Sequence, residues 1–200
     1  MTGKIKLNAA SGGGSVAFEG PGTSSNDKII KFPAAPGVIV QVQNTTVTAP
    51  SLVSCASAWA DSAITCAITP SSSSSKILIN STITGEGNAA NQQRFGFRIK
   101  KAISGGATTY LTGAAAGSRS LLTGLTGDLS DNATTTASTF SISNYLDSPS
   151  TTSAVTYMIQ FTYENTASSG TYYLNSQVSD SDAAANGRYV SWITLMEVSG

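Results

Sequence analysis

Apolar residues in this chain recur at every second position, and this period of two constrains the fold more than any other feature. In residues 94–100, Phe95, Phe97 and Ile99 alternate with glycine and basic residues, and residues 157–163 repeat the pattern with large apolar side chains. Successive side chains of a strand point to opposite faces of a sheet, so each run predicts a half-buried strand. Helical spacing is not sustained over more than about ten residues anywhere.

Residues 36–200 contain about eight to ten such strands of ordinary length, with turn signals between them. Residues 76–79 and the closing run 189–198 are apolar on both faces, which is typical of central strands. Gly105 and Gly106 predict a hairpin turn. We therefore predict an all-β protein with a short N-terminal β arm followed by a jelly-roll-like β-sandwich.

One long segment, residues 113–137, breaks the alternating pattern. It is rich in glycine, alanine, serine and threonine, and it carries a leucine cluster that fits either one helical turn or a short strand: Leu121, Leu122, Leu125 and Leu129. So long an irregular connection is unusual in a compact domain and is commonly functional.

The N-terminal segment is a pair of short alternating stretches around Gly12-Gly13-Gly14. Two such strands are too small to fold alone, so we expect another chain to complete them. We predict that the arm anchors the protein through its four apolar positions: Ile5, Leu7, Val16 and Phe18. Pro33, Pro36 and Gly37 mark a boundary, which gives an arm at residues 1–35 and a head at 36–200.

Composition narrows the class of partner. Eleven acidic and eleven basic residues cancel, so no net field favours nucleic acid or an anionic membrane. No stretch approaches the ~20 apolar residues of a membrane span, and the N-terminus lacks the pattern of a secretion signal. Charged residues make up 11 % of the chain, less than half the ~25 % of soluble domains, while apolar residues reach 40 %. These values favour a β-rich protein with a hydroxyl-rich surface over a disordered chain.

The chain has no histidine, which removes Ser–His–Asp and Cys–His catalysis and most zinc sites. Cys66 alternates with Ile64 and Ile68, so it is most simply a small core residue, with a disulfide to Cys55 as the alternative. The glycine run at 12–14 precedes a strand pattern rather than Lys-Ser/Thr and a helix, so it does not predict a phosphate site. We expect no cofactor.

Carboxylates are the remaining candidates for acid–base chemistry, but sequence spacing alone shows no catalytic pair. Asp180 with Asp182, and Asp128 with Asp131, have side chains that could ligate Ca²⁺. Neither segment matches a calcium loop, and we expect their side chains to cap turns instead. We therefore predict no catalytic residues and no metal site.

Aromatic residues are the candidates for sugar contact. Three of them sit in alternating strands, where we expect core positions: Tyr157, Tyr163 and Trp192. Tyr145 lies in a loop-like stretch beside Asn144 and Asp147, and these three are the candidate glycan contacts. The basic strand face is expected to be solvated, with a contact between subunits as the alternative: Arg94, Arg98 and Lys100.

Four segments stand out in order along the chain: the opening at 4–21, Pro-Gly-Val-Ile-Val-Gln-Val-Gln at 36–43, Ile-Thr-Pro followed by five serines and Lys-Ile-Leu-Ile at 68–79, and the ending at 193–198. All four resemble segments of tailed-bacteriophage virion proteins, especially those of marine cyanophages. The second is similar to the G-x-V-x-Q-V-x-Q segment of that family, and the third resembles its I-T-P-S-S-x-S-S-K-I-L signature.

The resemblance implies a fibre, spike or decoration component of the virion, typically homotrimeric, and it supplies no catalytic residues. We therefore expect a non-enzymatic structural protein, assembled in the host cytoplasm, whose arm binds capsid or tail proteins. The head would face outward and adhere to host cell-surface polysaccharide. The alternatives are a tail-fibre receptor-binding protein, a polysaccharide-degrading spike or an internal adaptor.

Overall fold

The computed structural model describes residues 4–8, 15–19, 37–55, 58–88, 95–125, 137–163 and 170–200. The chain divides into two units, Met1–Pro33 and Ala34–Gly200, which are described separately. Within the described ranges every regular element is a strand, and none of these residues forms a helix that could span a membrane.

The N-terminal unit contains two strands, β1 (Lys4–Asn8) and β2 (Ser15–Glu19), which pair antiparallel. This two-stranded ribbon is the β arm that the sequence predicts.

The first sheet of the larger unit is antiparallel and is built from six strands: β3 (Ile39–Val47), β4 (Ser51–Cys55), β6 (Lys76–Asn88), β10 (Ser138–Asp147), β12 (Gly170–Leu174) and β13 (Ser191–Val198). Strand β6 pairs with β10 along one edge. Along its other edge it pairs first with β13 and then, from Gly85 onward, with β12. Further from β6, β3 pairs with β13 and β4 pairs with β12. Strands β3 and β4 therefore lie end to end, as do β13 and β12, and each of these two pairs occupies one long position in the sheet with a break in it.

The second sheet is also antiparallel and is built from five strands: β5 (Ala60–Ile68), β7 (Phe95–Ile103), β8 (Thr108–Leu111), β9 (Gly124–Leu125) and β11 (Val155–Tyr163). Its order is β5, β11 and β7, with β8 and β9 sharing the far edge of β7. Gly105 has φ +70° and lies in the turn between β7 and β8, which confirms the hairpin predicted there.

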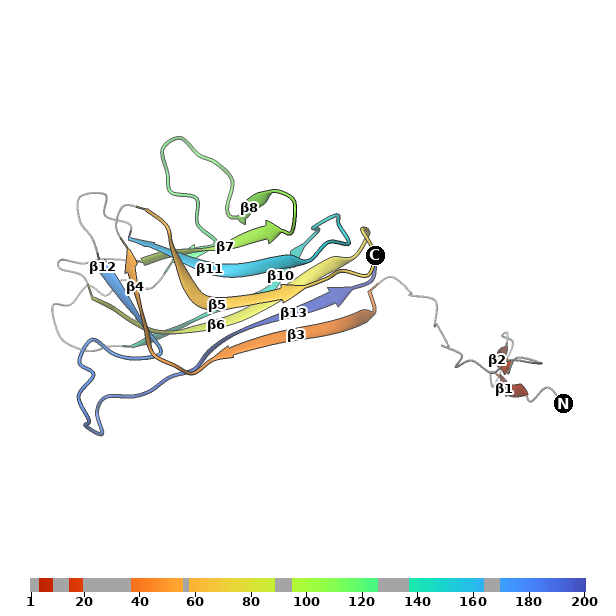
Figure 1. Cartoon of the computed structure of the whole chain (residues 1–200), viewed down its shortest axis with the longest axis horizontal. Helices are drawn as coiled ribbons and strands as arrows, with labels where there is room; N and C mark the ends of the chain where they lie inside the picture. The colour runs from red at the N-terminus through yellow and green to blue at the C-terminus, as the bar shows by residue number, and fades with distance from the viewer. Residues whose placement is uncertain are drawn as a thin grey trace. The chain divides into compact units, whose positions relative to one another are not determined.

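Together the sheets form a jelly roll (Figure 1). If each end-to-end pair counts as one position, the eight positions in chain order are arranged 1-8-3-6 in the first sheet and 2-7-4-5 in the second. This order of two packed antiparallel sheets is the jelly-roll arrangement. The prediction of an all-β protein with a β arm and a jelly-roll-like sandwich is confirmed.

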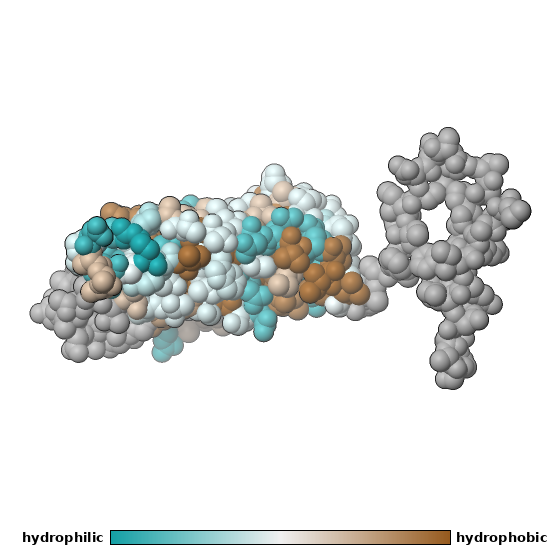
Figure 2. All heavy atoms as spheres, turned by 90° about the horizontal axis from the view of Figure 1, so that it is seen from below, coloured by the Kyte–Doolittle hydropathy of each residue, from teal (hydrophilic) through white to brown (hydrophobic). Residues whose placement is uncertain are grey.

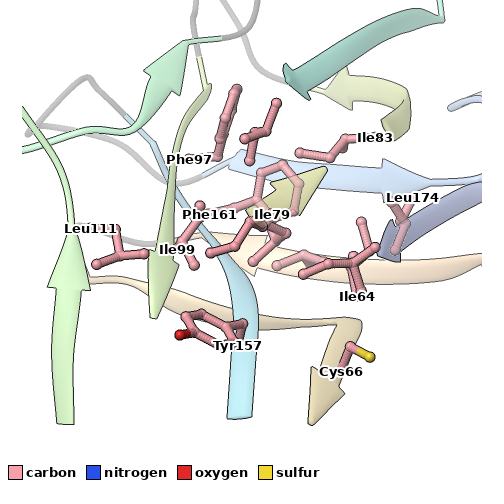
Figure 3. Close-up of a cluster of buried hydrophobic side chains, with 14 of the residues drawn as sticks. Ile64, Cys66, Ile79, Ile83, Phe97, Ile99, Leu111, Tyr157, Phe161 and Leu174 are labelled. Carbon is pink, nitrogen blue, oxygen red and sulfur yellow. The ribbon is translucent and has the colours of Figure 1, made fainter. Parts of the chain in front are cut away.

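The inner faces of the sheets meet in a single apolar core, part of which is shown in Figure 3. Phe161 of β11 stacks on Tyr172 of β12 in the opposite sheet, with ring centroids 4.5 Å apart, and Phe95 meets the same ring at 5.6 Å. Full burial of each large apolar side chain contributes about 1.5–3 kcal/mol. The two alternating runs that predict half-buried strands thus supply much of the interface between the sheets.

Trp192 has the opposite phase from the one expected. Ile193 and Leu195 of β13 are fully buried, whereas Trp192 is only half-buried and has the outward phase of the strand. Because β13 is apolar on both faces, its period of two does not by itself reveal which face is inside.

Buried Asn175 lies beside the breaks in both long strand positions, between β3 and β4 and between β12 and β13. Its side-chain amide donates to the carbonyl of Val47, where β3 ends, at 2.7 Å, and its Oδ1 accepts from Ser191, where β13 begins, at 2.6 Å. Asn175 has φ +60°, a conformation that asparagine tolerates better than most residues. One side chain thus satisfies backbone and hydroxyl groups that the strand breaks leave unpaired.

Glu197 of β13 is fully buried and fixes the serine-rich connection between β5 and β6. Its carboxylate accepts bonds from the Ser71 amide at 2.7 Å, the Ser71 hydroxyl at 2.6 Å and the Gln41 amide at 2.6 Å. Burial alone would raise the pKa of Glu197, but hydrogen bonds from Ser71, Gln41 and Ser75 outweigh it and lower the pKa from 4.5 to about 2.

We predict that Glu197 makes the fold sensitive to acid. Its pKa is near 4.5 when unfolded and about 2 when folded, so its stabilisation is complete above the unfolded value and is lost as the pH falls through the folded one. The loss is on the order of 3 kcal/mol. Urea unfolding from neutral pH downward should show a steeper fall in the free energy of unfolding for the native chain than for Glu197→Gln. Equal slopes would contradict the assignment.

Candidate functional site

The four predicted anchor positions fall in two directly paired positions of the N-terminal ribbon. Its register pairs Ile5 with Phe18 and Leu7 with Val16. A ribbon of two strands is at best marginally stable in water, so contact with another chain would stabilise it. The anchor role itself stays a prediction.

The three candidate glycan contacts do not converge on one surface. Tyr145 is half-buried and packs against the core, and Asp147 is only 8 % exposed. Asn144 is exposed, has φ +57°, and its backbone amide donates to the side chain of Asn80 at 2.9 Å. Glycan contact by this trio stays a prediction, with a single exposed side chain to support it.

Asp147 is instead the centre of a buried polar cluster that links the two sheets. It comes from β10 of the first sheet and accepts bonds from Tyr157 of β11 at 2.8 Å and from Lys101 of β7 at 3.0 Å. Burial, followed by the Asp147 charge and its hydrogen bond, raises the pKa of Tyr157, so the phenol stays protonated as the donor. The arrangement is that of a structural ion pair.

We predict that Asp147→Asn destabilises the fold by about 3 kcal/mol, because it leaves the Lys101 side chain, which is only 12 % exposed, without its counter-charge. Thermal or urea unfolding of the purified chain measures this. Exposed Asp182→Asn is the matched control and should change stability by no more than about 0.5 kcal/mol. Adding Lys101→Met to Asp147→Asn should recover part of the loss; no recovery would contradict the ion-pair assignment.

The outer face of the first sheet carries an apolar row that crosses four strands. Register places Val42 of β3 opposite Met196 of β13, Met196 opposite Leu78 of β6, and Leu78 opposite Leu146 of β10. Val42 is 53 % exposed and Leu146 49 %. We call this surface the apolar face and define it as this row together with the neighbouring residues Val38, Ile39, Val40 and Val198.

Viewed from the side of β3, the apolar colour gathers at one end of the head (Figure 2). Among the described strands β3 pairs only with β13, so its other edge is open beside the apolar face. Large contiguous apolar surfaces and open edges are both features that soluble proteins normally cover. Their coincidence indicates an interaction surface.

The chain enters the head next to this surface. The amide of Gly37 donates to the carbonyl of Ser199 at 2.9 Å, and the amide of Ser199 donates to the carbonyl of Val38 at 2.9 Å. Gly37 has φ +87°, a conformation that favours glycine. The beginning of the head is therefore fixed to its C-terminal end, at the margin of the apolar face.

The outer face of the second sheet is polar and differs in character. The guanidinium of Arg98 lies between two aromatic rings, 4.0 Å from the centroid of Trp59 and 3.5 Å from that of Tyr110. Its Nε donates to Gln160 at 2.8 Å, and the Gln160 amide in turn donates to Asp61. Lys100 forms an ion pair with Asp61 at 3.0 Å. These six residues are named the aromatic–cation face below.

The charged side chains of the aromatic–cation face interact with one another. The hydrogen bond from Gln160 lowers the pKa of Asp61, with further lowering from Lys100 and Arg98 that outweighs the effect of burial. Asp61 therefore stays ionised and holds Lys100 in place. Arg98 and Lys100 were expected as a solvated face with Arg94, which lies outside the described residues.

In the described part of the chain, no group of three or more His, Cys, Asp or Glu side chains is placed so that it could hold a metal ion. Cys55 and Cys66 are both buried and free, and burial raises the pKa of Cys55 to about 12, far from that of a nucleophilic thiol. Asp180 pairs with Arg188 in an exposed loop. Asp128 and Asp131 lie outside the described residues.

No protein-family model and no curated protein matches this chain.

Proposed function

We propose that this chain is a non-enzymatic structural component of a bacteriophage virion, a short trimeric fibre or decoration protein. Residues 36–200 form an outward-facing head for adhesion to host polysaccharide, and residues 1–35 attach it to capsid or tail proteins. The observation that carries the proposal is the apolar face, which a soluble monomer would leave in water beside Gly37, where the described head begins.

A second copy of the chain is the occupant that fits this face. The chain has a net charge of zero, so identical copies meet without long-range repulsion. Packing through the apolar face also covers the open edge of β3. The number of copies, three, comes from the resemblance to virion fibres. A head-to-tail contact repeated around a three-fold axis closes into a ring and leaves no copy of the contact surface free.

The position of Gly37 connects assembly with attachment. Because Gly37, the first described residue of the head, lies at the margin of the apolar face, heads that pack through this face bring these residues close to a shared axis. Three arms would then engage one virion site together, which raises the effective concentration of each.

We predict that the full chain sediments as a trimer of about 61 kDa, three times its mass of 20.4 kDa. Val42→Lys places a charge within the apolar face and should shift the mass toward the monomer at micromolar concentration. Ala67→Lys on the outer face of the second sheet is the matched control and should remain trimeric. A monomeric native chain, or equal effects of the two lysines, would contradict the proposal.

Removing residues 2–20 should leave a folded trimeric head that no longer joins the particle. Circular dichroism and sedimentation check the fold and mass of the truncated protein. Co-purification with virions, scored against the full chain expressed in the same infected cells, checks attachment. Truncated protein found on particles at the level of the full chain would disprove the anchor role of Ile5, Leu7, Val16 and Phe18.

A further inference from the structure

We propose that the aromatic–cation face binds acidic sugar units of a polysaccharide, with Tyr110 as the stacking surface and Arg98 and Lys100 as the cations that meet the acid group. This inference rests on the adhesive role in the proposed function and deepens it by naming the surface and the ligand class.

Tyr110 provides a fixed aromatic surface. One face of its ring lies over the Arg98 guanidinium at 3.5 Å, while 44 % of the residue remains exposed at the edge of the sheet. An aromatic ring offers an apolar face to the C–H groups of a pyranose and a hydroxyl to its polar rim. Tyr110 therefore has the form of a sugar platform whose position is set before any ligand arrives.

The polar groups beside the platform are also held in place. Arg98 is fixed by Trp59, Tyr110 and Gln160, and Lys100 is fixed by Asp61. Side chains already ordered lose little further entropy on binding. The planar guanidinium suits the paired oxygens of a carboxylate or sulfate.

The charge of this face favours an acidic ligand. Arg98 and Lys100 contribute two positive charges and Asp61 one negative, which leaves a local charge of +1 on a chain whose net charge is zero. Opposite charge speeds encounter and selects against ligands of the wrong sign. A uronate or sulfated sugar therefore fits this face better than a neutral sugar does.

The small side chains around Tyr110 favour a polymer as ligand over a small molecule that would need an enclosed pocket. The adjacent row on the outer face consists of small residues in direct register across four strands: Ala67, Thr156, Ala102 and Thr108. A surface of methyl and hydroxyl groups next to Tyr110 leaves room for a sugar chain to lie across the strands. Weak contacts of this kind gain strength when several heads engage one polysaccharide.

The test measures binding of the full-length chain to dextran, dextran sulfate and alginate by biolayer interferometry at physiological ionic strength. We expect binding to dextran sulfate or alginate and none to neutral dextran. Tyr110→Ala should weaken binding about two- to tenfold, the range for loss of one aromatic contact. Arg98→Lys keeps the charge but removes the planar stack and the bond to Gln160, and it should also weaken binding.

Arg188→Ala is the matched control because it removes an exposed cation that lies outside both the apolar face and the aromatic–cation face. Binding that falls with Arg188→Ala but is unchanged by Tyr110→Ala and Arg98→Lys would be diffuse charge attraction and would overturn the site. Equal binding to dextran would overturn the acidic ligand, and absence of binding to all three polymers would overturn the inference. Sedimentation of the same samples separates the two proposals, since a trimer that binds no glycan refutes only this one.

Discussion

The head depends on the antiparallel pairing of its last strand, β13, with its first strand, β3. Strand β13 lies between β3 and β6, so Val198, near the end of the head sequence, pairs directly with Ile39, near its beginning. This pairing closes the jelly roll and fixes Gly37 to Ser199. The pairing also requires contacts between residues that are very far apart in the sequence. Because closing such a long loop costs conformational entropy before the core forms, we expect this topology to fold slowly.

The same strands that bury the core generate two different outer faces. In β13 the inward phase carries Ile193, Leu195 and Glu197, and the outward phase carries Trp192 and Met196. In β7 the inward phase carries Phe95, Phe97 and Ile99, and the outward phase carries Arg98 and Lys100. The first sheet is therefore apolar on both sides near Gly37 and Ser199, whereas the second is amphipathic. This asymmetry is the reason why we propose self-association through the first sheet and ligand binding through the second.

Much of the fold could be predicted from the sequence because the signals were local. The alternating run at Phe95–Ile99, the turn at Gly105 and the doubly apolar strands all depend on neighbouring residues. The candidate surfaces could not be predicted in this way. The row from Val42 to Leu146 requires the register of four strands, and Asp147 is buried by Lys101 and Tyr157, neither of which is adjacent to it in the sequence. The phase of Trp192 was wrong because its strand is apolar on both faces.

The separation of the two outer faces has a consequence for assembly. The sheets of a sandwich pack through their inner faces, so their outer faces point in opposite directions. A neighbouring copy that covers the apolar face of the first sheet therefore leaves the second sheet open. A trimer built in this way would keep Trp59, Arg98 and Tyr110 of every copy accessible, with the three sites facing away from the shared axis. In the assembly that we propose, self-association and glycan contact would use different surfaces, and assembly through the first sheet would raise the avidity of the second.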